Sequence, residues 1–131
     1  MKKILIWDCT LPTLSSEREI SLLAREKNAL AQKIASLGVN ALELSAVRNP
    51  KEDTVIHKTL AAGVGDVSLV APVGDDEAGI ETAWAGICEA SRPVLLVDLP
   101  VSTVQMEYTY HLKEDKMADK ISALISCAKK K

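Results

Sequence analysis

Four short apolar runs divide the chain and are separated by longer stretches with helical spacing. The runs cover residues 4–7, 39–47, 67–73 and 94–99. Short apolar runs bounded by polar residues are typical of strands that are buried on both faces, as in a parallel sheet. We therefore expect four strands, and we expect the loop after the first, residues 8–16, to lie where parallel α/β folds carry their chemistry.

The longest helical pattern follows the first strand. Ser16 and Glu19 have the spacing of a capping box, which predicts a helix from residue 16 to about residue 37. Gly38 fits the position just past its end. A second possibility is a later start near Leu22, with residues 12–21 as a loop.

Three further helices are expected after the other strands. Pro50 suits the first turn of a helix over residues 51–62. Asp75, Asp76 and Glu77 open a helix that reaches about residue 91, where acidic side chains favour the helix dipole. The last helix is expected from residue 113 or 114 to 128. Regular strand–helix alternation predicts an α/β protein with right-handed crossovers and a parallel sheet, in one domain over residues 1–131.

Length, charge and cysteine content exclude several classes. The chain has 131 residues, a net charge of −2 and dispersed basic residues, so we expect no nucleic-acid surface. Its apolar runs are too short for a signal peptide or a membrane span. Three cysteines without a close pair indicate reduced thiols, and hence a cytoplasmic protein.

A few side chains are candidates for chemistry. Glu43 sits inside an apolar run, where it needs either a hydrogen-bond partner or a polar site at the sheet's end. Cys9 is either a nucleophile or, as we expect, a small buried thiol. His57 and His111 lie on different elements and are expected to be surface or packed side chains and not metal ligands. The acids at residues 75–77 have a structural explanation at a helix start.

Four stretches together resemble a known family. Residues 8–11 (DCTL) are similar to its D-x-T-L motif, residues 25–39 to its first barrel helix, residues 41–43 (ALE) to its V-I-E strand and residues 100–113 to its P-V-S-D-x-Q-I-E loop. The whole chain thus resembles the N-terminal half of the homocitrate synthase and isopropylmalate synthase family. The last stretch favours homocitrate synthase. That family is a metal-dependent TIM barrel related to HMG-CoA lyase, and it catalyses Claisen condensation of acetyl-CoA with an α-keto acid.

The resemblance also implies which side chains carry the site. It gives Glu43 a catalytic role and places Asp8 and Ser102 near the substrate, but it supplies no metal ligand in this chain. Pro12 stands where the family has its substrate-polarising arginine, and Thr13 where it has its metal-binding aspartate. We expect no cofactor for the chain alone, and a divalent Mg²⁺ or Mn²⁺ if a partner completes the site.

Four strand–helix units make only half of an eight-stranded barrel. Such a half leaves unpaired strand edges and exposed apolar side chains. We expect a homodimer or a partner chain with the second half-barrel; an open sheet with helices on both faces is the alternative. For function, the resemblance implies an acyltransferase subunit that is inactive alone. The alternatives are a non-catalytic binding or regulatory module, or a degenerate product without selected activity.

Overall fold

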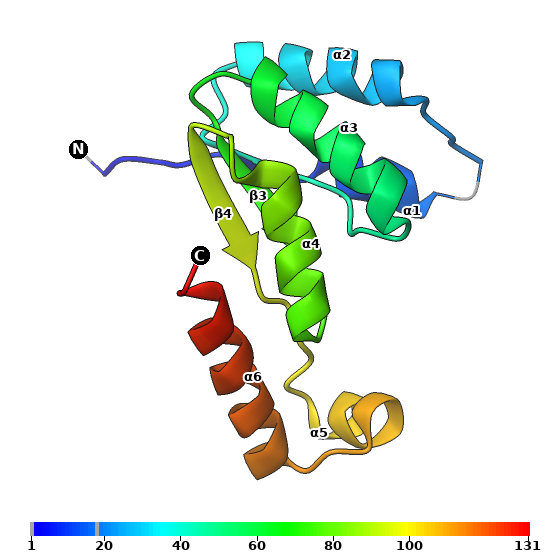
Figure 1. Cartoon of the computed structure of the whole chain (residues 1–131), viewed down its shortest axis with the longest axis vertical. Coiled ribbons are helices and arrows are strands. Elements are labelled where there is room, and N and C mark those ends of the chain that lie inside the picture. Colours follow the sequence, from blue (N-terminus) through cyan, green and yellow to red (C-terminus); the bar gives the residue numbers. More distant parts are fainter. Residues whose placement is uncertain (1, 18) are drawn as a thin grey trace.

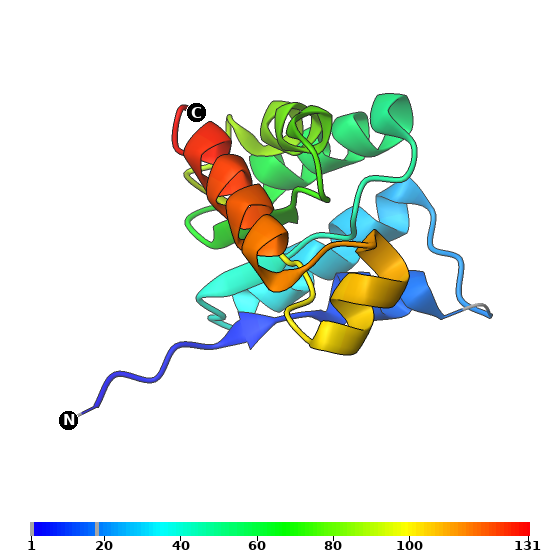
Figure 2. The ribbon, with the colours of Figure 1, turned by 90° about the horizontal axis from the view of Figure 1, so that it is seen from below.

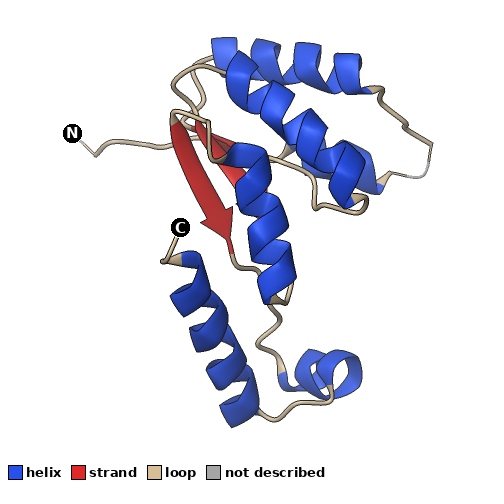
Figure 3. Cartoon of the chain, in the orientation of Figure 1, coloured by secondary structure: helices blue, strands red, loops and turns tan. Residues whose placement is uncertain are grey.

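The computed structural model describes residues 2–17 and 19–131. Its strands form one parallel sheet in the order β1-β2-β3-β4 (Figures 1 and 3). The bounds are β1 Trp7–Asp8, β2 Ala41–Glu43, β3 Ser68–Pro72 and β4 Arg92–Leu96. The four expected strands and the α/β class are therefore confirmed, with shorter strands than the apolar runs predicted.

Helices follow every strand, which confirms the four βα units. The bounds are α1 Thr10–Ser16, α2 Ala24–Ser36, α3 Pro50–Gly63, α4 Glu77–Ile87, α5 Thr103–Gln105 and α6 Glu114–Ala128, with a π-helical turn η1 over Met106–Tyr110. The short α5 and η1 were not predicted. In Figure 1 the segment from α5 to the start of α6 lies at the opposite end of the molecule from α2.

The sequential strand order decides how the layers form. Right-handed crossovers between neighbours in sequence place successive helices on the same face of the sheet, as in a barrel and unlike a doubly wound fold. The main core lies there: Leu42, Leu44, Leu69 and Ala71 of the sheet region are buried with side chains of α2, α3, α4 and α6. The structure therefore resembles half of a TIM barrel, and the alternative with helices on both faces is not what forms.

The opposite face of the sheet is partly open. The strand register puts Trp7, Glu43, Val70 and Val94 on this face, which we call the inner face because it corresponds to a barrel interior. Val70 is buried, but Trp7 is 49% and Val94 38% exposed. Apolar side chains at both edges of the sheet thus remain in contact with solvent.

The prediction that residues 4–7 form a strand buried on both faces is wrong. Only Trp7 enters β1, and Ile4, Leu5 and Ile6 are 82%, 65% and 56% exposed. The reason is position, since β1 is an edge strand and Figure 2 shows the segment before it extending away from the body. Its end is held by the backbone of Ile6, whose N–H donates to Asn40 Oδ1 at 2.8 Å.

The capping box at Ser16 and Glu19 is also wrong. Ser16 ends α1, and its hydroxyl donates to the Thr13 carbonyl at 2.7 Å. α2 instead begins at Ala24, where the Glu26 carboxylate accepts the Leu23 N–H at 2.8 Å. The possibility of a later start near Leu22 is therefore closer to the structure, although residues 12–16 of its expected loop belong to the helix α1. Arg18, between these residues, lies outside the described residues.

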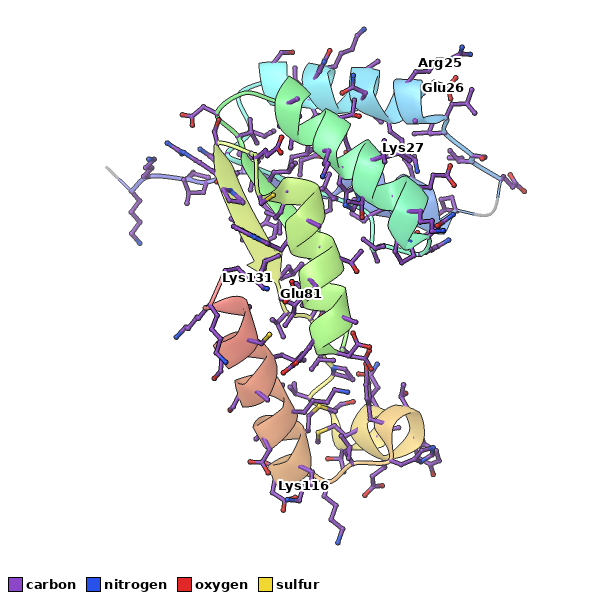
Figure 4. All side chains as sticks on the ribbon, in the orientation of Figure 1. Arg25, Glu26, Lys27, Glu81, Lys116 and Lys131 are labelled. Carbon is purple, nitrogen blue, oxygen red and sulfur yellow. The ribbon has the colours of Figure 1, made fainter. Side chains whose placement is uncertain are left out.

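Other helix ends follow the prediction. Gly38, with φ +84°, takes the left-handed conformation after α2, and Pro50 opens α3. Asp76 caps α4 by accepting the Gly79 N–H at 2.7 Å, which confirms the structural explanation for the acids. At the other end of the chain, Lys131 pairs with Glu81 of α4 and ties α6 to it (Figure 4).

Candidate functional site

The Glu43 carboxylate is the centre of a small polar cluster on the inner face. Trp7 Nε1 donates to Glu43 Oε2 at 3.0 Å, and the Cys9 thiol donates to the same oxygen at 3.4 Å. Trp7 and Cys9 are two residues apart, so they project from the same side of the chain at β1, next to Glu43 on β2. We call these three residues the Glu43 cluster. Of the two possibilities for Glu43, a hydrogen-bond partner is therefore what the fold provides.

Cys9 differs from the expectation of a small buried thiol. It is exposed, because it lies just after an edge strand whose inner face is uncovered. Partial desolvation raises the pKa of Cys9, and the hydrogen bond and negative charge of Glu43 raise it further. A raised pKa keeps the thiol protonated, so the cluster does not activate Cys9 as a nucleophile.

Asp8 is used locally. Its Oδ1 accepts the Thr10 N–H at 3.0 Å and its Oδ2 accepts the Thr10 hydroxyl at 2.9 Å. These bonds hold the first turn of α1, which directly follows β1. The substrate-binding role of Asp8 stays a prediction, and both of its oxygens already have a partner.

Ser102 follows β4 along the chain. It is the N-cap of α5, and its hydroxyl oxygen accepts the Gln105 N–H at 3.3 Å. Among the hydrogen bonds of the described residues, none joins Ser102 to the Glu43 cluster. The resemblance placed Asp8, Glu43 and Ser102 in one site. In the structure Glu43 bonds to Trp7 and Cys9, on either side of Asp8, whereas Asp8 and Ser102 make their side-chain hydrogen bonds locally.

The residues present do not fit the divalent metal that the resemblance implies. Thr13, at the position of the metal-binding aspartate, donates its hydroxyl to the Cys9 carbonyl at 2.7 Å. Glu43 is occupied by two donors. In residues 2–17 and 19–131, no three His, Cys, Asp or Glu side chains gather closely enough to hold a metal ion. A hard cation needs several oxygen ligands, and the described residues around Glu43 do not supply them.

His57 was expected to be a surface or packed side chain, without a role in a site. It is packed, as one of the two expectations held, at 4% exposure on α3. Burial lowers the pKa of His57, and nearby Lys27 lowers it further, whereas Asp53 and the Ser45 backbone raise it. His57 and Asp53 are four residues apart on α3, which was the available sequence signal. The contribution of Lys27 depends on how α2 packs on α3.

Comparison with known proteins supports the resemblance. No family model matches the chain. It is 24% identical over 131 residues to 2-isopropylmalate synthase from Bacillus licheniformis, and 26% identical over 130 residues to that from Carboxydothermus hydrogenoformans. The chain is similar to 2-isopropylmalate synthases over its whole length. The chain is also 24% identical over 130 residues to 2-isopropylmalate synthase from Halothermothrix orenii.

The similarity covers all of this chain but a small part of each synthase. Between 99% and 100% of the chain is aligned, against 25–26% of the synthases, so the chain spans about a quarter of their length. The expected resemblance to the isopropylmalate synthase family is therefore confirmed. In the described part of the chain, no helix is long and apolar enough to cross a membrane.

Proposed function

We propose that the chain is a half-barrel of the acetyl-CoA/α-keto acid acyltransferase type that acts only as part of a larger barrel. The observation that carries this proposal is the sequential parallel sheet with an apolar, partly open inner face. An eight-stranded barrel has no free edges, whereas this sheet has two. Four additional strand–helix units would cover Trp7, Val94 and the exposed segment 4–6.

The chain is inactive on its own in this proposal. The family reaction places a developing oxyanion between a metal ion and an arginine, and removal of such stabilisation costs orders of magnitude in rate. Pro12 has no cationic group, and the Thr13 hydroxyl is a poor substitute for a carboxylate on a hard cation. Glu43 remains the acid that a completed site would use, after release from Trp7 and Cys9.

A condensation assay tests this inactivity. The purified chain is incubated with acetyl-CoA, α-ketoglutarate and Mn²⁺, and free CoA is measured by chromatography. We expect no CoA release above the rate without protein. Condensation product formed in proportion to the chain would contradict the proposal, provided that Glu43→Gln abolishes it and a contaminating enzyme is thereby excluded.

Metal binding separates the two function classes that the sequence left open. Isothermal titration with Mn²⁺, with and without α-ketoglutarate, should show no specific binding if the module is non-catalytic. Binding that disappears in Glu43→Gln would instead support a rebuilt site and an acyltransferase subunit. The preference for homocitrate synthase over isopropylmalate synthase stays a prediction, and the same assay with other α-keto acids would test it.

We further propose that the missing strands come from a second copy when the chain is alone. Each half-barrel has the same two free strand edges and the same apolar inner face. Two copies related by twofold symmetry can therefore pair their edges and bury their inner faces against each other. A different polypeptide with the second half-barrel is the alternative source. The chain's mass in solution tests the first arrangement.

A further inference from the structure

A second pocket, away from the Glu43 cluster, opens where α1, the start of α2 and the loop after β2 meet. Its volume is about 190 Å³, and it is lined by Ser15 and Ser45, by Lys27 of α2, and by Arg48 and Asp53 near the start of α3. We call it the Lys27 pocket. Glu43, Trp7 and Cys9 do not line it. In Figure 4 the Lys27 label marks where α2 runs beside α3.

The Lys27 side chain is half-buried and forms no ion pair with another described residue, although Asp53 lines the same pocket. Within residues 2–17 and 19–131, no carboxylate lies within 4.0 Å of its ammonium group. A half-buried ammonium is costly unless an anion or several acceptors compensate it. The guanidinium-bearing Arg48 lines the same pocket, so two cationic side chains face this space.

The one carboxylate in the pocket is already engaged. Asp53 Oδ2 accepts the N–H groups of Arg48 and Asn49 at 2.7 and 2.8 Å. Burial opposes ionisation, but these two donors outweigh it and lower the pKa of Asp53, with Lys27 and His57 contributing. Asp53 therefore organises the loop after β2 and leaves the donors of Lys27 and Arg48 to another partner.

The pocket continues inward to a buried histidine. A second cavity of about 20 Å³ shares Lys27, Ser45 and Asp53 with the Lys27 pocket and is also lined by His57. That volume is enough for one water molecule. His57 is 4% exposed, and its Nδ1 has no hydrogen-bond partner in the part of the chain that the structure describes. The His57 Nδ1 atom itself lies against Gly86 of α4, where a Cβ would be 3.3 Å away, so the candidate binding groups are Lys27 and Arg48 and not His57.

We propose that the Lys27 pocket binds a small oxyanion, such as a phosphate or carboxylate group, through Lys27 and Arg48. The hydroxyls of Ser15 and Ser45, 2.6 Å apart in the pocket wall, are engaged with each other and with the Leu11 carbonyl, so the two cations carry the binding. Charge-assisted bonds from two cations to one oxyanion are the strongest that such a small pocket can supply. This proposal does not depend on the half-barrel function.

Nuclear magnetic resonance titration tests the site in the full chain. Inorganic phosphate and acetate are added in separate titrations at constant ionic strength, with sodium chloride as the third. We expect saturable amide shifts centred on residues 45–49 and on Lys27. Saturable shifts with phosphate alone or with acetate alone would show which of the two groups, phosphate or carboxylate, the pocket binds. Shifts that do not saturate with either, or that chloride reproduces, would overturn the proposal.

Charge variants locate the site. Lys27→Gln should weaken binding by about tenfold or more, as expected for the loss of one charge-assisted hydrogen bond. Lys33→Gln is the matched control, because Lys33 is an exposed lysine on the same helix. Lys27→Arg keeps the charge and should keep binding, which guards against a mere folding defect in Lys27→Gln. Equal affinity in the Lys27→Gln and Lys33→Gln variants would contradict the assignment.

Discussion

At the scale of single residues, the Glu43 carboxylate organises the surroundings of β1 through two hydrogen bonds. It accepts hydrogen bonds from Trp7 and Cys9, and the latter raises the pKa of the thiol. The same residues in a completed barrel would face the interior. For Glu43 to act on a substrate there, its hydrogen bonds to Trp7 and Cys9 would have to break.

The reactivity of the Cys9 thiol should depend on the Glu43 carboxylate. In Glu43→Gln the negative charge beside the thiol is lost, so the pKa of Cys9 falls and its thiolate fraction at pH 8 increases. We expect faster alkylation of Cys9 by iodoacetamide, measured by peptide mass spectrometry. Cys88, exposed after α4, is the internal control and should react at an unchanged rate. An unchanged ratio of Cys9 to Cys88 labelling would show that Glu43 does not control the thiol.

His57 should make stability depend on pH. Its pKa in the folded chain lies below the ordinary value of 6.5, so the unfolded chain binds more protons as the pH falls. The stability associated with neutral His57 is present above about pH 6.5 and decreases as the pH falls through that value towards the folded pKa. Asp53 on α3 and Lys27 on α2 are the charged groups that act on it, while Gly86 of α4 is uncharged.

Urea denaturation between about pH 5 and 8 measures this effect. The free energy of unfolding of the wild type should fall towards pH 5 more steeply than that of His57→Gln. The exposed His111→Gln variant should follow the wild type. Parallel curves for wild type and His57→Gln would contradict the assignment.

At the scale of elements, the contact between α3 and α4 depends on a missing side chain. A Cβ built on Gly86 would lie 2.8 Å from His57 Cβ, closer than side-chain carbons pack. The glycine weakens α4 by roughly 1 kcal/mol relative to alanine. In return, the absence of a side chain at Gly86 lets α4 pack closely against α3.

Gly86→Ala should therefore destabilise the chain although alanine favours helix. We expect a loss of roughly 1–3 kcal/mol in the free energy of unfolding, the usual cost of overpacking. In a His57→Gly background the same substitution should be neutral or stabilising, because the His57 Cβ that would clash is gone. A double-mutant cycle measures this coupling. Equal losses in both backgrounds would show that the clash is elsewhere.

Much of the element order could be predicted from sequence, and the misses have physical causes. Apolar runs and helical spacing located four strands and four long helices. They did not reveal α1, because residues 8–16 were expected to form the loop after the first strand. Pro12 is nevertheless tolerated in the first turn of α1. The site was harder, since the meeting of Trp7 and Cys9 with Glu43 depends on strand register. Ile4, Leu5 and Ile6 read as buried because a pattern shows apolar character but not whether a covering element exists.

At the scale of the whole molecule, the structure has one covered and one partly open sheet face. The covered face holds the main core, and the inner face ends in the exposed apolar segment 4–6. Exposed apolar edge strands promote pairing with another chain unless charges or prolines block them. Association with another chain is thus what the half-barrel proposal predicts.

Charged substitutions on this segment should weaken association without loss of folding. Ile4→Lys together with Ile6→Lys places two charges beside the edge strand β1 and should shift the mass towards the monomer. Since both side chains are exposed, thermal stability should change by no more than about 0.5 kcal/mol for each. Val55→Lys is the control, as Val55 is 63% exposed on α3. An equal effect of the control would mean that association does not involve the β1 edge.

The most direct measurement is the mass of the isolated chain by light scattering coupled to size-exclusion chromatography. The half-barrel account predicts a species of twice the 14.1 kDa chain mass at micromolar concentration. A chain that stays at 14.1 kDa across the accessible concentration range would contradict pairing between two copies.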